Sequence, residues 1–87
     1  MEEFVNQVKR LRPKTDIGRF YLATYVEKTD YSKQYFTIGK SYLFAVTRGE
    51  ESLVTIDDED DIHPWNSGTF IQHFKLISVI HIAEVDR

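Results

Sequence analysis

Residues 35–77 read YFTIGKSYLFAVTRGEESLVTIDDEDDIHPWNSGTFIQHFKLI, and this stretch decides the fold. Apolar and β-branched residues form brief runs along it, at 42–46, 53–56 and 62–65. Arg48 and Gly49 predict a hairpin turn between the first two runs, and the acidic residues 57–61 predict a second turn before the third. Brief strands that are so closely connected indicate an antiparallel sheet curled into a small barrel.

The flanking segments add elements on both sides of this centre. Residues 19–27 alternate aromatic and branched side chains and predict a strand, whereas the polar residues 28–34 predict a loop that holds Tyr31. Residues 69–77 have apolar side chains at helix-like intervals, which predicts one helical turn followed by a strand. The apolar run 76–85 predicts a final strand.

The N-terminal residues 2–12 place apolar side chains at helical spacing, with acids first and bases last. A short helix is expected, and it should end near Arg12 because Pro13 disfavours a helical conformation in the residue before it. An extended lead-in strand is the alternative for this segment.

The chain of 87 residues is sufficient for one domain with one core, since 41% of its residues are hydrophobic and 14% are aromatic. We predict a single domain over 1–87, with a helix or arm at 1–14, a barrel at 19–77 and a C-terminal strand at 78–87. The expected class is mainly β, with an antiparallel barrel of five or six strands. The predicted core residues are Leu22, Tyr42, Phe44, Val54, Ile56, Phe74 and Ile77.

Several functional classes are disfavoured by the composition. The chain has no cysteine, so disulfide scaffolds, cysteine zinc sites and thiol nucleophiles are excluded. No early apolar run resembles a signal peptide, and no run approaches the roughly 18 apolar residues of a membrane span. A cytoplasmic protein without membrane contact is expected.

The sequence holds no catalytic or cofactor motif. The acids that start at Asp57 alternate as calcium ligands do, but the sixth and twelfth positions of such a loop would be Ile62 and Gly68 instead of glycine and glutamate. The three histidines lack zinc-enzyme spacing, and no serine lies in a nucleophile elbow. We therefore predict a protein that is not an enzyme, with no catalytic residue, metal or cofactor.

Four short segments carry a resemblance to a known group of proteins. They are Phe36-Thr37-Ile38-Gly39-Lys40-Ser41-Tyr42, Ile56-Asp57-Asp58, His63-Pro64-Trp65 and Phe74-Lys75-Leu76-Ile77. Together with the hairpin, this pattern resembles small SH3-like β-barrel proteins that are common among uncharacterised bacteriophage genes, and it covers about half of the chain. The resemblance implies an SH3-like barrel, and an accessory protein that inhibits or sequesters a host factor, such as an immune-defence factor, in the host cytoplasm.

Charge is divided along the chain, with bases concentrated in residues 1–20 and seven acids in residues 50–61. Acidic loops attract basic protein surfaces, and tyrosine and tryptophan are frequent interface anchors. The alternative is that both charged segments are ordinary solvated surface and that Trp65 lies in the core. We predict that the acidic turn contributes to partner capture more than to folding, and the predicted partner-binding residues are Tyr31, Asp57, Asp58, Glu59, Asp60, Asp61 and Trp65.

A second hypothesis is a barrel that binds a nucleotide or single-stranded nucleic acid. Barrels of this kind bind single strands with aromatic side chains that are flanked by Lys and Arg residues. The pI near 5.5 opposes a general attraction to phosphate, so such binding would be local. The predicted residues for this alternative are Lys9, Arg10, Arg12, Lys14, Arg19 and Tyr21.

The final apolar run also predicts self-association. Strict alternation would place Leu76, Ile80 and Ile82 on one face, with Ile77, Val79 and Ala83 on the other. A small barrel has one interior, so the second apolar face needs a cover from the N-terminal helix or from another chain. We predict a homodimer or higher oligomer through Ile80 and Ile82.

Overall fold

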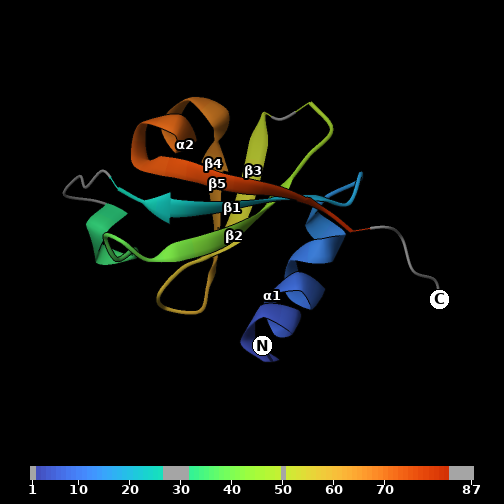
Figure 1. Cartoon of the computed structure of the whole chain (residues 1–87), viewed down its shortest axis with the longest axis horizontal. Helices are drawn as coiled ribbons and strands as arrows, with labels where there is room; N and C mark the ends of the chain where they lie inside the picture. The colour runs from blue at the N-terminus through green and yellow to red at the C-terminus, as the bar shows by residue number, and fades with distance from the viewer. Residues whose placement is uncertain (1, 27–31, 50, 83–87) are drawn as a thin grey trace.

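The computed structural model describes residues 2–26, 32–49 and 51–82. Its five strands form one antiparallel sheet in the order β4-β3-β2-β1-β5 (Figure 1). The strands are β1 (Arg19–Tyr25), β2 (Ser41–Val46), β3 (Ser52–Ile56), β4 (Ile62–Asn66) and β5 (Phe74–His81). The helices are α1 (Glu2–Leu11) and α2 (Ser67–His73), with 3-10 turns at Arg12–Lys14 and Ser32–Gln34. The predictions of a mainly β fold and a short N-terminal helix are confirmed.

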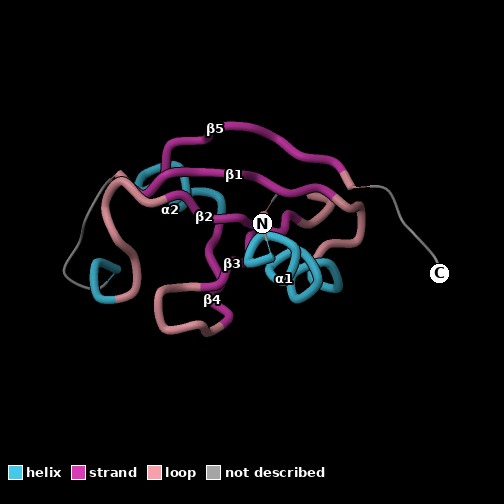
Figure 2. The backbone as a smooth tube through the Cα atoms, turned by 60° about the horizontal axis from the view of Figure 1, so that its bottom comes forward, coloured by secondary structure: helices cyan, strands magenta, loops and turns pink. Residues whose placement is uncertain are grey.

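The prediction of a closed barrel is wrong, because β4 and β5 are the two edges of the sheet and do not pair. Figure 2 shows the strands following one another around a curve from β5 to β4. Helix α2 connects these two edges, and its Phe70 ring lies 5.5 Å from the ring of Phe74 and 4.9 Å from that of Phe44. Side chains of the two edge strands meet without backbone pairing, since the Trp65 ring of β4 lies 5.1 Å from the Phe74 ring of β5.

Each face of the curved sheet has its own buried cluster. The aromatic core lies on the face that carries α2 and consists of Ala23, Tyr25, Phe36, Tyr42, Phe44, Val46, Leu53, Phe70 and Phe74. The α1 core lies on the other face and consists of Leu11, Phe20, Leu43, Ala45 and Ile56. Strand β2 supplies alternate residues to both clusters, so it is the central strand and is buried on both sides.

Most of the predicted core is confirmed. Tyr42, Phe44, Ile56 and Phe74 are buried. The remaining three are not fully buried: Leu22 and Val54 are half-buried, and Ile77 is 52% exposed.

Ile77 is exposed because of a bulge in β5. Leu22 pairs with Ser78, whereas the next residue, Ala23, pairs with Leu76, so Ile77 is the extra residue of its strand. A residue opposite no partner shifts the alternation of every side chain that follows it. The apolar pattern of residues 76–82 therefore cannot be read with a strict period of two.

The bulge also corrects the predicted faces of β5. Leu76 and Val79 lie on the aromatic-core face, opposite Ala23 and Tyr21. Ile80 and Ile82 pack against the α1 core and are half-buried. The two isoleucines that were predicted to form an oligomer interface thus make contacts within their own chain. Strand β5 extends from Phe74 to His81 and belongs to the sheet, while residues 83–87 of the predicted C-terminal strand lie outside the described residues.

Candidate functional site

The acidic turn between β3 and β4 is built around the buried side chain of Asp57. Its Oδ1 accepts hydrogen bonds from the backbone N–H groups of Glu59 (2.9 Å) and Asp61 (3.0 Å). Its Oδ2 lies 3.1 Å from Nδ1 of His63. These contacts of a buried carboxylate hold the turn in shape, whereas the role of Asp57 in partner binding stays a prediction.

Asp58 is the centre of a polar network that joins three segments. Its carboxylate accepts hydrogen bonds from the Thr37 hydroxyl (2.7 Å), the Tyr42 hydroxyl (2.8 Å) and the Lys40 ammonium (3.0 Å). The Tyr42 oxygen also accepts the backbone N–H of Thr37 at 2.8 Å. The segment Phe36–Tyr42, which carries the resemblance, is therefore attached to the acidic turn by these bonds.

These contacts move two pKa values in opposite directions. Burial alone would raise the pKa of Asp58, but the hydrogen bonds from Thr37, Tyr42 and Lys40 outweigh burial and lower it below 3.8. Burial, assisted by the neighbouring Asp58 charge, raises the pKa of Tyr42 from 10.0 to about 12 despite the opposing hydrogen bond from Thr37. The folded protein thus favours a charged Asp58 and a neutral Tyr42.

We predict that stability depends on pH through this pair. The contribution of Asp58 is present above its unfolded pKa and is lost as the pH falls through the lower folded pKa. The contribution of Tyr42 is lost as the pH rises from 10.0 to about 12. Urea unfolding midpoints measured across pH should fall at both extremes.

Two variants separate the contributions. Asp58→Asn should flatten the acid limb of the pH profile, and Tyr42→Phe should flatten the alkaline limb. An acid limb of unchanged slope in Asp58→Asn would show that this network does not govern acid stability.

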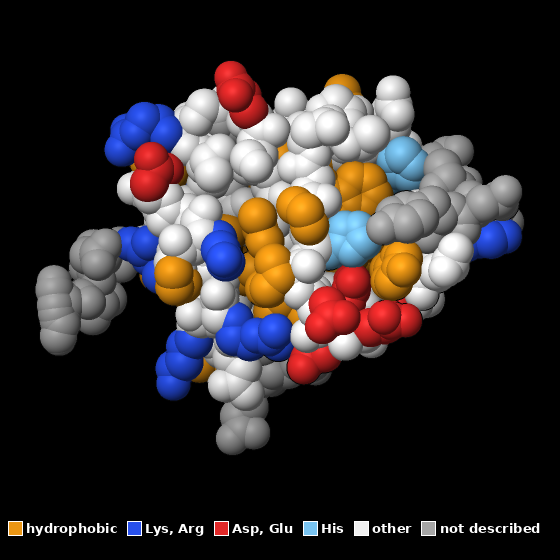
Figure 3. Space-filling model, turned by 180° about the vertical axis from the view of Figure 1, so that it is seen from behind, with side chains coloured by type: hydrophobic (Ala, Val, Ile, Leu, Met, Phe, Trp, Pro, Cys, Tyr) orange, Lys and Arg blue, Asp and Glu red, His pale blue; other side chains and the backbone are white. Residues whose placement is uncertain are grey.

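The other acids of the turn are exposed. Asp60 accepts a hydrogen bond from Arg10 of α1 at 2.7 Å, while the side chains of Glu59 and Asp61 point to solvent. Figure 3 shows acidic side chains gathered beside Lys and Arg side chains on this face. Acidic and basic side chains therefore lie side by side where the turn meets α1, and the two charges are not on separate surfaces there.

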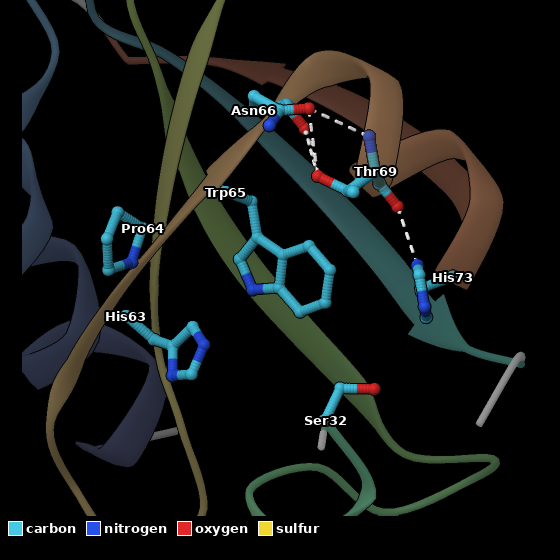
Figure 4. A pocket seen from close by; sticks show the side chains of 7 residues that line it. All are labelled: Ser32, His63, Pro64, Trp65, Asn66, Thr69 and His73. Carbon is cyan, nitrogen blue, oxygen red and sulfur yellow. Dashed lines mark hydrogen bonds between the residues drawn. The ribbon is translucent and has the colours of Figure 1, made fainter. Parts of the chain in front are cut away.

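Trp65 has features of both alternatives that the sequence left open, because its ring packs on the core and also lines a cavity. It is half-buried against the aromatic core, 5.1 Å from the ring of Phe74 and 5.5 Å from that of Phe36. It also lines the Trp65 hollow, a cavity of about 330 Å³ between β4 and α2 (Figure 4). The lining residues are Ser32, His63, Pro64, Trp65, Asn66, Thr69 and His73. Tyr31, also predicted for partner binding, lies outside the described residues.

The two histidines of this hollow are candidate binding residues that were not predicted from the sequence. His63 and Trp65 are two positions apart on β4, and side chains at this spacing share one face of a strand. His73 comes from the last turn of α2, so its position depends on how α2 packs against β4. The spacing of His63 and Trp65 could have been recognised in the sequence, whereas the position of His73 beside them arises only in the folded chain.

The residues predicted for nucleotide binding are not brought into one site. Tyr21 lies on the aromatic-core face, 5.8 Å from the ring of Phe70. Lys9 and Arg10 belong to α1, which covers the opposite face. Arg12 donates to the Thr15 carbonyl, Lys14 is exposed in the same 3-10 turn, and Arg19 begins β1.

The outer edge of β5 is a further candidate surface. Among the strands of the described residues, β5 pairs with β1 alone, and residues 75–79 are all exposed. The exposed fractions are 45% for Leu76, 52% for Ile77 and 55% for Val79. Beside them lies the β5 hollow, a cleft of about 370 Å³ lined by Tyr21, Leu53, Ser67, Phe70, Ile71, Phe74 and Leu76. A strand edge with apolar side chains beside an apolar cleft can receive an extended chain.

Within residues 2–26, 32–49 and 51–82, no group of three metal-ligating side chains is present, and no helix is long and apolar enough to cross a membrane. The two candidate binding sites described above are the Trp65 hollow and the edge of β5. The chain matches no family model, no curated protein and no solved structure.

Proposed function

We propose that this protein is a non-enzymatic protein-binding module that takes up an extended segment of a partner along β5. The observation that carries the proposal is the exposed apolar edge formed by Leu76, Ile77 and Val79. Natural sheets protect their edges with charges, prolines or covering segments, because an unprotected edge pairs with other chains. In β5, the exposed run holds one charged residue, Lys75.

The adjoining β5 hollow supports this binding mode. Strand addition provides backbone hydrogen bonds along the edge, while alternate side chains of the added strand enter neighbouring pockets. Leu76 belongs both to the exposed edge and to the lining of the hollow, and Ile71 of α2 is 73% exposed on its rim. An added strand with apolar residues at every second position would cover both features.

We further propose that the partner is a host factor and that the fold is an opened relative of SH3-like barrels. Both follow from the resemblance to bacteriophage proteins, and the short antiparallel strands with brief connections support the second. The acidic turn lies between β3 and β4, away from the β5 edge. Its exposed Glu59 and Asp61 would then assist the approach of a basic partner without forming the contact.

The test compares capture from host lysate by the wild type and by the double variant Leu76→Lys, Val79→Lys. Both substituted side chains are about half exposed, so the variant should fold, while capture of the specific partner should fall at least tenfold through lost apolar contact. Ile38→Lys is the matched control, because Ile38 is also 52% exposed but lies outside β5. Equal capture by all three proteins would contradict the proposal.

Two further measurements identify the class of partner. Nuclease treatment of the lysate should leave capture unchanged, and loss of capture would favour the nucleic-acid alternative. Light scattering on the purified protein should show a monomer of 10.3 kDa if β5 is reserved for another protein. A dimer that the double variant dissociates would instead make a second copy of the chain the occupant of β5.

A further inference from the structure

The Trp65 hollow has the size and the walls of a site for a small planar ligand. Its volume of about 330 Å³ is at the lower end of the range for ligand pockets, which is roughly 300–1,000 Å³. Figure 4 shows the rings of His63 and Trp65 on β4 and that of His73 at the end of α2 around one space. The Trp65 ring lies 5.8 Å from that of His63 and 5.3 Å from that of His73. Aromatic walls of this kind favour a flat ring that can stack on them.

His73 supplies a directed polar group in this apolar setting. The side chain is 8% exposed, and its Nδ1 lies 2.8 Å from the backbone carbonyl of Thr69. A carbonyl oxygen only accepts, so Nδ1 carries the hydrogen, and Nε2 of the neutral ring is a hydrogen-bond acceptor. Within residues 2–26, 32–49 and 51–82, the only hydrogen bond of the His73 ring is the one at Nδ1, and the ring lines the hollow. Nε2 can therefore accept a hydrogen bond from a ligand that carries a donor into the hollow.

The rim beside His73 is also ordered. Asn66 caps α2, and its Oδ1 accepts from the backbone N–H and the hydroxyl of Thr69, both at 2.9 Å. This arrangement fixes the position of Thr69, whose carbonyl sets the tautomer of His73. The acceptor is therefore held in place before a ligand arrives.

We propose that the Trp65 hollow binds a heteroaromatic base with an exocyclic amino group, of the adenine type, that stacks on Trp65 and donates to Nε2 of His73. Stacking on an aromatic side chain is sequence-tolerant and contributes much of the affinity in base recognition. The amino group satisfies the acceptor that the fold leaves open. This site differs from the β5 edge and uses none of the basic residues that the sequence suggested for nucleotides.

The only tryptophan of the chain lies in this hollow, so its fluorescence reports binding directly. We expect adenosine to change Trp65 emission along a saturable curve. N6,N6-dimethyladenosine keeps the stacking ring but lacks the amino hydrogens, so it should bind about tenfold more weakly. N-acetyltryptophanamide, titrated with the same nucleosides, is the control for collisional quenching.

The variant His73→Phe keeps an aromatic ring and removes the acceptor. It should bind the two nucleosides with equal affinity, whereas the wild type distinguishes them. A second measurement does not depend on the folding of this variant: the ¹⁵N resonance of His73 Nε2 in the wild type should shift on addition of adenosine. The double variant Leu76→Lys, Val79→Lys should keep its affinity for adenosine, which separates this site from the proposed protein-binding edge.

Three outcomes would overturn the proposal. One is emission that shows no saturation up to about 10 mM adenosine, well above the millimolar range of weak ligands. Another is equal affinity of the wild type for adenosine and its dimethyl analogue. The third is an unchanged ¹⁵N resonance of His73 Nε2 at saturation.

Discussion

Replacing Phe44 with alanine is expected to lower the free energy of unfolding by about 3 to 5 kcal/mol, which is most of the stability of a small domain. Phe44 is fully buried in the aromatic core at the centre of β2. Its ring lies 4.9 Å from that of Phe70 and 4.8 Å from that of Phe74, so truncation leaves a cavity that joins β2, α2 and β5. Urea unfolding followed by circular dichroism measures the loss.

Ile71→Ala is the matched control for this substitution. It also removes an apolar side chain near α2, but Ile71 is 73% exposed, so its free energy of unfolding should change by no more than about 0.5 kcal/mol. A Phe44→Ala protein with the midpoint of the wild type would show that the aromatic core is not packed as described.

Replacing Asp57 with alanine is expected to lower the free energy of unfolding by about 2 to 4 kcal/mol. The substitution leaves the backbone N–H groups of Glu59 and Asp61 without this acceptor and removes one partner of His63. It also removes hydrogen bonds that hold the turn around Asp60. This residue has a φ of 66°, which is uncommon for a residue other than glycine, so the turn depends on such bonds. Thermal and urea unfolding of the variant measure the effect.

The control for Asp57→Ala is Glu59→Ala, which removes an exposed acid from the same turn. This change should leave stability within about 0.5 kcal/mol of the wild type. Similar stability of the two variants would instead support the prediction from the sequence that the acidic turn contributes more to partner capture than to folding.

The sequence contained enough local signal to predict most elements. The apolar run 42–46 contained the predicted core residues Tyr42 and Phe44, which are buried, and Pro13 marked the end of α1. These features depend on a few neighbouring residues. Short-range rules were therefore sufficient for them.

Three features could not be predicted because they depend on distant packing. The bulge at Ile77 is set by the register with β1, and an apolar run on both sides of it gives no sign of the shift. The five acids of the turn look alike in sequence, and only the folded turn selects Asp57 as the buried one. The packing of Phe70 of α2 on Phe44 and Phe74 joins residues from three separate elements, and the positions of the strands in the sequence do not reveal it.

The pairing of β1 with β5 has a consequence for the speed of folding. Hydrogen bonds join residues that are far apart in the chain, such as His81 Nε2 and the Ile17 carbonyl at a separation of 64 positions. Closing so long a loop costs conformational entropy before the strand gains its contacts, so sheets of this kind fold in milliseconds to seconds. Because β5 is an edge held mainly by β1, we expect it to be the last strand to dock and the first to open. The backbone amides of β5 would then exchange with solvent sooner than those of β2, and the surface offered to a partner would be the part of the sheet that opens most often.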